Sequence, residues 1–251
     1  MLKLQKVTVV YPGSSAEARK NRDTFPGEKK AIDDIDLAVS EGESVALVGE
    51  NGAGKTTLLF AIAGVLEPLQ GTVTIDDIQL TKKTINEIRK RIGLVFQNPD
   101  DQLFMPSVFD DIAFGCRNFG MPVNMVKTRV NETLERLNIS HLGSCSALKL
   151  SYGEKRLAAI ATVLAMEPSV LMFDEPTAFL DHKARRTVIE ILKKLHHTKI
   201  VATHDLNFAA EVCRRVIILS NGRIAADGTP DLLYDRELMR NCGLEAIQLF
   251  K

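Results

Sequence analysis

The sequence has no excess of charge of either sign, because 32 Lys and Arg residues balance 32 Asp and Glu residues in a chain of 251. That balance provides no strong electrostatic attraction toward nucleic acid or an acidic membrane surface. Cysteine is also scarce: four residues lie far apart, with no C-x-x-C pair. The spacing argues against a zinc site, a redox motif or a disulfide framework. We expect four small buried side chains in a protein of a reducing cytoplasm.

Long apolar runs are missing too. The longest, around 157–166, is far shorter than the ~20 residues of a membrane-spanning helix. Lys3, Gln5 and Lys6 interrupt the start of the chain, so we expect no secretory signal. With 25% charged and 45% hydrophobic residues, the composition is that of an ordinary globular protein. Any work at a membrane therefore requires another chain that crosses it.

The most informative feature that is present is the run GENGAGKT at 49–56, which fits the pattern G-x-x-x-x-G-K-[ST]. Glycines let such a loop bend so that successive N–H groups point at phosphate oxygens. Lys55 adds a point charge for the β- and γ-phosphates, and the Thr56 hydroxyl is a ligand for Mg²⁺. The expected nucleotide-binding residues of this run and its end are Gly49, Asn51, Gly52, Ala53, Gly54, Lys55, Thr56 and Thr57.

The flanks of this loop fit the same motif. Residues 44–48 form an apolar run typical of a buried strand, and 57–63 an apolar helix. Further strands are expected at 4–10, 35–39, 72–75, 92–96, 170–173 and 200–202, and a hairpin joins 216–219 to 223–225 through Asn221-Gly222. Residues 98–166 have a helical texture, and Thr229-Pro230-Asp231 is expected to open a last helix. The order predicts an α/β nucleotide-binding core with a helical insert.

Two carboxylates, Asp174 and Glu175, follow the apolar run at 170–173. In a fold with a phosphate-binding loop, Asp174 would hold Mg²⁺, directly or through water, and Glu175 would polarise the attacking water. Acidic pairs at strand ends also serve simply as helix caps. The glycine loop is what favours the catalytic interpretation.

A second helix start lies at 151–154, Ser-Tyr-Gly-Glu, before an amphipathic run. Ser151 suits the N-cap position, and Gly153 permits the close approach of another backbone. Such a start binds phosphate or, more simply, caps its own helix.

Taken together, these motifs resemble the ATP-binding subunit of an ATP-binding-cassette (ABC) transporter. Residues 150–154, LSYGE, resemble the signature sequence of that family, and 178–181 resemble its D-loop. Gln97 resembles the Q-loop glutamine and His204 the switch histidine. The matches follow the family's order over nearly the whole chain. Tyr152 departs from the pattern, since the family usually has glycine there, and Glu154 replaces the commoner glutamine.

The resemblance implies an α/β fold, a P-loop NTPase core of the ABC ATPase type with an antiparallel β subdomain and an α-helical subdomain. One domain, 1–251, would have its core and β subdomain at 1–97 and 167–251 and its helical subdomain, with the signature, at 98–166. The implied cofactors are ATP and Mg²⁺, and the implied partner is a second ABC cassette in a homodimer or heterodimer. The implied catalytic residues are Glu175, His204, Gln97 and Lys55; the Mg²⁺ ligands are Thr56, Gln97 and Asp174; and Ser151, Gly153, Glu154 and Asp181 complete the nucleotide site.

Two side chains keep alternatives open. Tyr11, after the first strand, stands where the family has its adenine-stacking aromatic residue, and Phe25 is its rival. His204 in isolation also fits a core histidine at a strand end, although its context favours a contact with the γ-phosphate. The other histidines, His141, His182, His196 and His197, show no ligand spacing and are expected on the solvated surface.

The phrase QNPDDQLF at 97–104 is similar to the cassettes of energy-coupling-factor and cobalt- or nickel-type importers. The similarity implies uptake of a vitamin or metal ion through a transmembrane coupling protein and a substrate-binding membrane protein, with this chain at the cytoplasmic face. Leu103, Phe104 and Met105 then form an apolar groove for a helix of the coupling protein or, alternatively, pack inside the helical insert. Two other functions stay open. One is a non-transport ABC ATPase acting on nucleic acid or ribosomes, although no nucleic acid is expected, and the other is a weakly hydrolysing regulatory cassette, which Tyr152 favours.

Overall fold

The computed structural model describes residues 1–11 and 30–248. The chain falls into two compact units, one of Met1–Arg89 with Ala202–Lys251 and one of Lys90–Val201. Helix α2 (Ile85–Arg91) and strand β8 (Thr198–Thr203) carry the chain across the boundary between them. Within the described ranges, none of the helices has the length and apolar character needed to span a bilayer.

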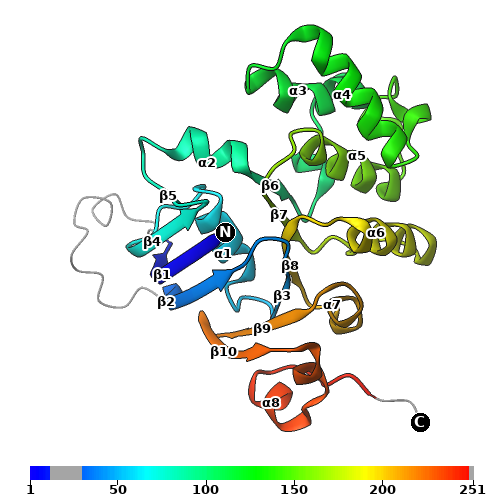
Figure 1. Ribbon diagram of the computed structural model, residues 1–251. Coiled ribbons are helices and arrows are strands. Elements are labelled where there is room, and N and C mark those ends of the chain that lie inside the picture. The colour runs from blue at the N-terminus through cyan, green and yellow to red at the C-terminus, as the bar shows by residue number, and fades with distance from the viewer. Residues whose placement is uncertain (12–29, 249–251) are drawn as a thin grey trace. The chain divides into compact units, whose positions relative to one another are not determined.

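The first unit contains a four-stranded antiparallel sheet in the order β2-β1-β4-β5 (Figure 1). Its strands are β1 (Leu2–Val10), β2 (Lys30–Val39), β4 (Gln70–Ile75) and β5 (Ile78–Gln79). Leu4 of β1 is paired with Leu37 of β2 on one side and with Val73 of β4 on the other. All three side chains are buried, so one face of the sheet supplies an apolar core. This sheet confirms the expected antiparallel β part of the fold.

The same unit holds the strand that precedes the glycine loop. Strand β3 (Ser44–Val48) is buried throughout and runs parallel to β9 (Arg215–Ser220), with Leu47 beside Ile217. A turn at Asn221-Gly222 joins β9 to β10 (Arg223–Gly228). Both turn residues have positive φ, as a type I′ turn requires, and Asn-Gly suits that turn best. The predicted hairpin is therefore confirmed. Helices α1 (Lys55–Ile62) and α7 (Leu206–Val212) also belong to this unit.

The second unit is mainly helical. Strands β6 (Ile92–Val95) and β7 (Val170–Asp174) are parallel neighbours, with Leu94 beside Met172. Between them come η1 (Pro99–Asp101), α3 (Val108–Asn118), α4 (Val123–Arg136), η2 (Ser140–Leu142), η3 (Ala147–Lys149) and α5 (Tyr152–Leu164), and α6 (His182–Lys194) follows β7. Helix α3 packs against both α4 and α5, which Figure 1 shows in green and yellow-green. The expected helical stretch is thus confirmed.

Three of the four cysteines are buried, as the sequence predicts. Cys116, Cys213 and Cys242 are buried, Cys145 is half-buried, and all four are free thiols. Burial raises the pKa of Cys116 and of Cys242. A thiol with a raised pKa is a poor nucleophile, so these two act as small apolar side chains.

The last part of the chain differs from the sequence prediction. A 3-10 helix, η4, covers Pro230–Tyr234, and a separate α-helix, α8, covers Arg236–Asn241. The Thr229 hydroxyl donates to the Asp231 carboxylate at 2.8 Å and caps no backbone N–H. Asp235 caps α8 instead, through two N–H groups of its first turn. A local side-chain bond therefore competes with helix capping, and two short helices replace the single one expected.

One histidine prediction was wrong. His141, His182 and His196 are exposed as expected, but His197, which directly precedes β8, is half-buried. Its Nδ1 is buried and has no hydrogen-bond partner among the described residues. Burial, followed by the nearby charge of Arg136, lowers the pKa of His197. Neighbouring elements that the sequence pattern does not reveal take this ring out of water.

Candidate functional site

The glycine loop at 49–56 joins β3 to α1 in the first unit. Gly52 and Gly54 have φ angles of 82° and 106°, in the left-handed region that glycine adopts at little cost. A Cβ at Gly54 would lie 2.5 Å from the carbonyl oxygen of Ala31, and one at Gly49 would lie 2.4 Å from that of Leu219. Backbone conformation and close neighbouring backbone thus both require the glycines.

The start of α1 is open to an anion. Gly54 is the N-cap and has no side chain to cap the helix, and no acidic residue lies in the first turn. Among the described residues, no atom lies within 4 Å of a Cβ placed at Gly52, so the described part of the loop leaves space at this glycine. A helix N-terminus carries partial positive charge and unsatisfied N–H groups. The loop therefore fits a phosphate group.

Lys55 folds back over the loop. Its Nζ donates to the carbonyl oxygens of Gly49 at 2.7 Å and Glu50 at 3.1 Å, and its side chain is buried. Ala53 is buried and its carbonyl accepts from the Gly222 N–H at 3.1 Å, which ties the loop to the β9–β10 turn. A buried ammonium group needs such acceptors, and phosphate oxygens are stronger ones. The loop thus holds a cation where a phosphate fits.

Tyr11 lies beside this loop. Its hydroxyl is 2.9 Å from the hydroxyl of Thr57, a residue of α1. The ring is exposed, so a face is left for stacking on a base. Phe25, the rival for this role, lies outside the described residues. The choice of Tyr11 stays a prediction, supported by its anchor on α1.

His204 follows β8 in the first unit and is exposed. Its neighbours form a fixed turn: the Asp205 N–H donates to the Thr203 hydroxyl at 3.0 Å. The Asp205 carboxylate then caps α7 by accepting from the Phe208 N–H at 2.9 Å. An exposed imidazole on such a turn does not fit the core-histidine alternative. It suits contact with a ligand or a partner.

Asp174 and Glu175 lie in the second unit, at the end of β7, and both are buried. Glu175 has a φ of 46°, which is uncommon for a residue with a side chain. Such strained backbone is frequent at functional sites. Asp174 and Glu175 are not the cap of the helix that follows them. The Asp181 carboxylate caps that helix, α6, by accepting from the Ala184 N–H at 2.7 Å.

Ser151 and Glu154 form a capping box at the start of α5. The Glu154 N–H donates to the Ser151 hydroxyl at 3.3 Å, and the Ser151 N–H donates to the Glu154 carboxylate at 2.8 Å. The Ser151 hydroxyl, which also donates to this carboxylate, is the main cause of the lowered pKa of Glu154. A Cβ at Gly153 would lie 2.8 Å from the Cβ of Ala184, so glycine here allows α5 and α6 to pack closely. The expected cap is confirmed, while the close neighbour is a side chain and not a backbone.

Sequence reasoning missed Arg156. Its side chain is fully buried and donates to the carbonyl oxygens of Phe96, at 2.6 Å, and of Gln97. Burial is the main cause of the lowered pKa of this guanidinium group. A signal was present in the sequence, because Arg156 lies one helical turn before Ile160, on the face predicted to be apolar. Gln97 itself is exposed.

The structure gathers the expected residues into two sets. The first unit contains Tyr11, Gly49, Asn51, Gly52, Ala53, Gly54, Lys55, Thr56, Thr57 and His204. The second contains Gln97, Ser151, Gly153, Glu154, Asp174, Glu175 and Asp181. One set fits phosphate binding, and the other supplies carboxylates and a capped helix start.

Comparison with known protein families decides what these motifs belong to. The family model described as ABC transporter matches residues 32–178. The chain belongs to the ABC transporter family. The energy-coupling factor transporter ATP-binding protein EcfA of Carboxydothermus hydrogenoformans is 40% identical over 230 residues, which cover 90% of this cassette and 85% of that protein.

Solved structures agree with this assignment. The cassette is similar to cbiO1 from Clostridium perfringens, part of the ABC transporter complex cbiONQ, with a TM-score of 0.79 and 34% identity over 96% of this chain and 93% of that one. It is also similar to a dimeric ATP-binding cassette bound to ADP and Pi after hydrolysis, with a TM-score of 0.78 and 28% identity over 92% and 99%. The chain therefore has the ABC ATPase fold and is the ATP-binding, ATP-hydrolysing subunit of an ABC transporter.

Proposed function

We propose that this cassette powers an importer of the energy-coupling-factor type. It works at the cytoplasmic face of the cell membrane and drives uptake of a vitamin or a transition-metal ion such as cobalt or nickel. A transmembrane coupling protein and a substrate-binding membrane protein are its partners. Its similarity to EcfA and to cbiO1 supports this type over other ABC ATPases. Residues 1–251 act as one domain in this proposal, with 98–166 as its helical subdomain.

The proposed roles of the two residue sets follow from their chemistry. The loop N–H groups and Lys55 bind the phosphates of ATP, and Tyr11 stacks on the adenine. Glu175 polarises the attacking water, and His204 and Gln97 act at the γ-phosphate. Buried carboxylates and preset donors suit this work because they need little reorganisation during the reaction.

The residues present also fit Mg²⁺. Thr56, Gln97 and Asp174 offer hydroxyl, amide and carboxylate oxygens, which are the ligands that Mg²⁺ prefers. When bound with ATP, the ion neutralises charge that develops on the phosphates. A Cβ at Gly52 would meet no neighbour among the described residues, so the loop has room for the phosphates that Mg²⁺ accompanies.

We further propose that the helix start at Ser151 serves the nucleotide of a second cassette. Its capping box fixes the first turn of α5, and Gly153 and Glu154 belong to that turn. If ATP binds the closed dimer more tightly than the open one, that difference supplies the conformational work of transport. The dimer is formed by two copies of this chain or by this chain and a different cassette. The dimeric solved cassette supports the arrangement.

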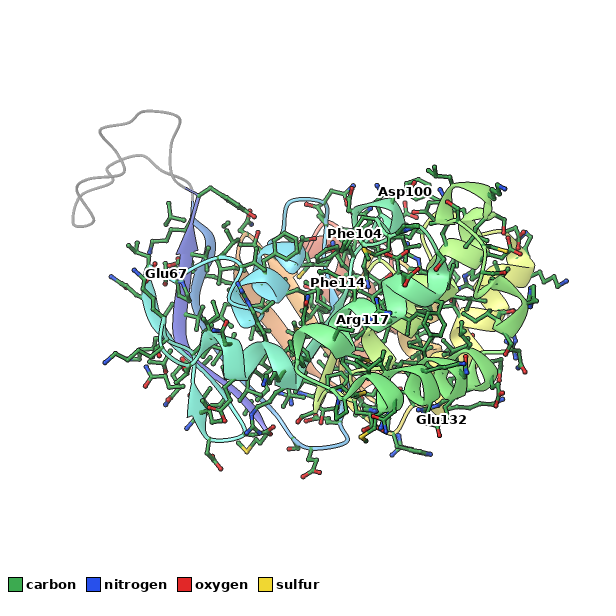
Figure 2. The ribbon with its side chains drawn as sticks, turned by 90° about the horizontal axis from the view of Figure 1, so that it is seen from above. Glu67, Asp100, Phe104, Phe114, Arg117 and Glu132 are labelled. Atoms are coloured by element: carbon green, nitrogen blue, oxygen red, sulfur yellow. The ribbon has the colours of Figure 1, made fainter. Side chains whose placement is uncertain are left out.

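The observation that carries the importer proposal is an exposed aromatic pair on the helical unit. Phe104 is 64% exposed and Phe114 is 39% exposed, and their rings meet edge to face with centroids 5.0 Å apart. Figure 2 shows the two labelled side chains close together. Leu103 is buried, so only part of the expected groove packs inside. Exposed apolar side chains in contact suit the apolar face of a partner helix.

Asp111 holds this pair in place. Its Oδ1 accepts from the N–H groups of Phe104 and Met105, both at 2.9 Å. Asp111 is buried in α3, and burial is the main cause of its raised pKa. Phe114 lies three residues further along the same helix, so one carboxylate fixes the loop ring next to the helix ring. The exposed pair is therefore a fixed feature and not a loose surface side chain.

Co-purification tests the proposal. We expect the tagged cassette to be recovered from detergent-solubilised membranes together with a transmembrane coupling protein. Phe104→Asp should lower that recovery about tenfold, because a buried charge in an apolar contact is costly. Val123→Asp is the matched control, since Val123 is 84% exposed in the same unit. Recovery with ribosomes or DNA, or equal recovery of the coupling protein with both variants, would contradict the importer proposal.

A further inference from the structure

Tyr152 makes three side-chain contacts within the second unit. Its hydroxyl donates to the Gln97 carbonyl oxygen at 3.3 Å. Its ring meets Phe179 edge to face, with centroids 6.0 Å apart and planes at 82°. The Arg156 guanidinium lies 5.7 Å from the ring centroid. One side chain at the start of α5 thus touches two other segments of the second unit.

Arg156 acts on the same segment as Tyr152. Its guanidinium donates to the carbonyl oxygens of Phe96 and Gln97 and is fully buried. Residues four apart lie on one face of a helix, so α5 presents both side chains to these carbonyls. A buried cation loses hydration, and the face of an aromatic ring compensates part of that loss. Tyr152 therefore donates a hydrogen bond to the Gln97 carbonyl oxygen. Its ring also stabilises the guanidinium group of Arg156, which is the second donor to that oxygen.

Phe179 belongs to the segment between Glu175 and α6. It is 79% exposed and has a φ of 60°, which is unfavourable for a bulky side chain. Backbone of this kind persists where neighbouring groups hold it. The edge-to-face contact with Tyr152 is such a restraint. The segment that follows the two carboxylates is thereby linked to the start of α5.

We propose that Tyr152 is a positioning residue that fixes the backbone of Gln97 and the segment of Phe179 to the start of α5. Turnover in this cassette then depends on the side chain of Tyr152. The inference rests on the ATPase activity and on the role proposed for Gln97, but not on the importer proposal. Tyr152 holds the segments of Gln97 and Phe179 in place and takes no part in the chemical step itself.

A graded set of variants tests the proposal in the full purified chain. Tyr152→Phe removes only the hydroxyl, and we expect kcat for ATP hydrolysis to fall about threefold, the effect of one modest hydrogen bond. Tyr152→Gly removes all three contacts and should lower kcat about tenfold or more. KM for ATP should change less than about twofold, because positioning acts in the transition state. Equal turnover of Tyr152→Gly and wild type, or a rise in KM that accounts for the whole loss, would overturn the proposal.

Hydrogen exchange supplies a readout that does not need activity. Amides of 96–104 should exchange faster in Tyr152→Gly than in wild type and nearly normally in Tyr152→Phe, because local opening is easier without the restraints. Phe179→Ala should add little to the effect of Tyr152→Gly on kcat, since Tyr152→Gly already removes the contact between the two rings. Unchanged exchange in Tyr152→Gly, or fully multiplicative effects of the two variants, would contradict the inference.

Matched controls separate this inference from the others. Tyr234→Phe removes the hydroxyl of a tyrosine in η4 of the first unit and should leave kcat and exchange of 96–104 unchanged. The rate of ATP hydrolysis measured with Lys55→Ala serves as the background. Hydrolysis faster than this background is then due to this chain. All measurements use the isolated cassette, and failure to bind a membrane partner would leave their outcome intact.

Discussion

The glycine loop at 49–56 and the signature stretch at 150–156 both belong to the ATPase, yet they are built in opposite ways. In the loop, small residues clear space and let the backbone take left-handed angles, as at Gly54. In the signature stretch, the large side chains of Tyr152 and Arg156 bond the backbone of another segment. Backbone N–H groups that a loop presents are readable in the sequence as a string of glycines. Side-chain contacts between distant segments become visible only in three dimensions.

The largest effect should come from the loop. Lys55→Ala removes the only side-chain cation of the glycine loop motif, and we expect ATPase activity to fall at least about 100-fold, as for other losses of transition-state charge stabilisation. Phosphate release measures it. Lys82→Ala is the control, because that lysine is 81% exposed and its pair with Glu67 is a weak surface contact at 3.8 Å. Near-wild-type turnover of Lys55→Ala would contradict the proposal that the glycine loop binds the phosphates of ATP.

A glycine pair separates conformation from packing. Gly54→Ala combines a φ of 106° with a Cβ 2.5 Å from a carbonyl oxygen, so we expect a loss of about 3 kcal/mol in the free energy of unfolding. Gly120→Ala has a φ of 82°, but its Cβ would meet no atom of the described residues within 4 Å, so it should cost about 1 kcal/mol. Urea denaturation measures both. Equal losses would show that close packing does not constrain the loop.

The sequence predicted most of what is local. The Asn221-Gly222 turn, the Ser151 cap and the glycine loop each depend on a few adjacent residues, and all three are present. Arg156, Asp111 and His197 were missed, because their burial depends on segments that are distant in the sequence. Tyr152 stood out as a departure from the family, but its contacts with Gln97 and Phe179 could not be inferred without the fold.

Asp111 extends the comparison to the exposed pair of Phe104 and Phe114. Asp111→Ala leaves the N–H groups of Phe104 and Met105 without their acceptor and should lower the free energy of unfolding by about 2 kcal/mol. Asp111→Asn keeps the accepting oxygen and should cost less than about 1 kcal/mol. Thermal or urea denaturation distinguishes the two variants. Equal losses would contradict the role of Asp111 in anchoring Phe104 and Met105.

The same residue predicts a pH dependence. Folding raises the pKa of Asp111 above its ordinary value of 3.8, so the folded state binds this proton more tightly and wild-type stability is lost as pH rises through that window. The stability of Asp111→Asn relative to wild type should therefore increase from pH 3.8 upward and level off above the raised pKa. Denaturation curves between acid and neutral pH measure the trend, and a difference that falls with pH would contradict it.

The smallest effect should come from the capping box. Ser151→Ala should cost about 1 kcal/mol in the free energy of unfolding, as for other N-caps. Because Ser151 lowers the pKa of Glu154, its contribution is present above the ordinary value of 4.5 and is lost as pH falls through the folded pKa. The difference between variant and wild type should thus shrink in acid. A difference independent of pH would mean that the Glu154 carboxylate takes no part in the cap.

In the proposed mechanism, the glycine loop and the Ser151 region are halves of a site that two cassettes complete. The direct measurement is the mass of Glu175→Gln in solution by size-exclusion chromatography with light scattering. With ATP and Mg²⁺, slow hydrolysis should trap a dimer, while ADP, or the added change Lys55→Ala, should leave monomers. If Glu175→Gln binds ATP and stays monomeric, both alone and with the coupling protein, the two-cassette site is wrong.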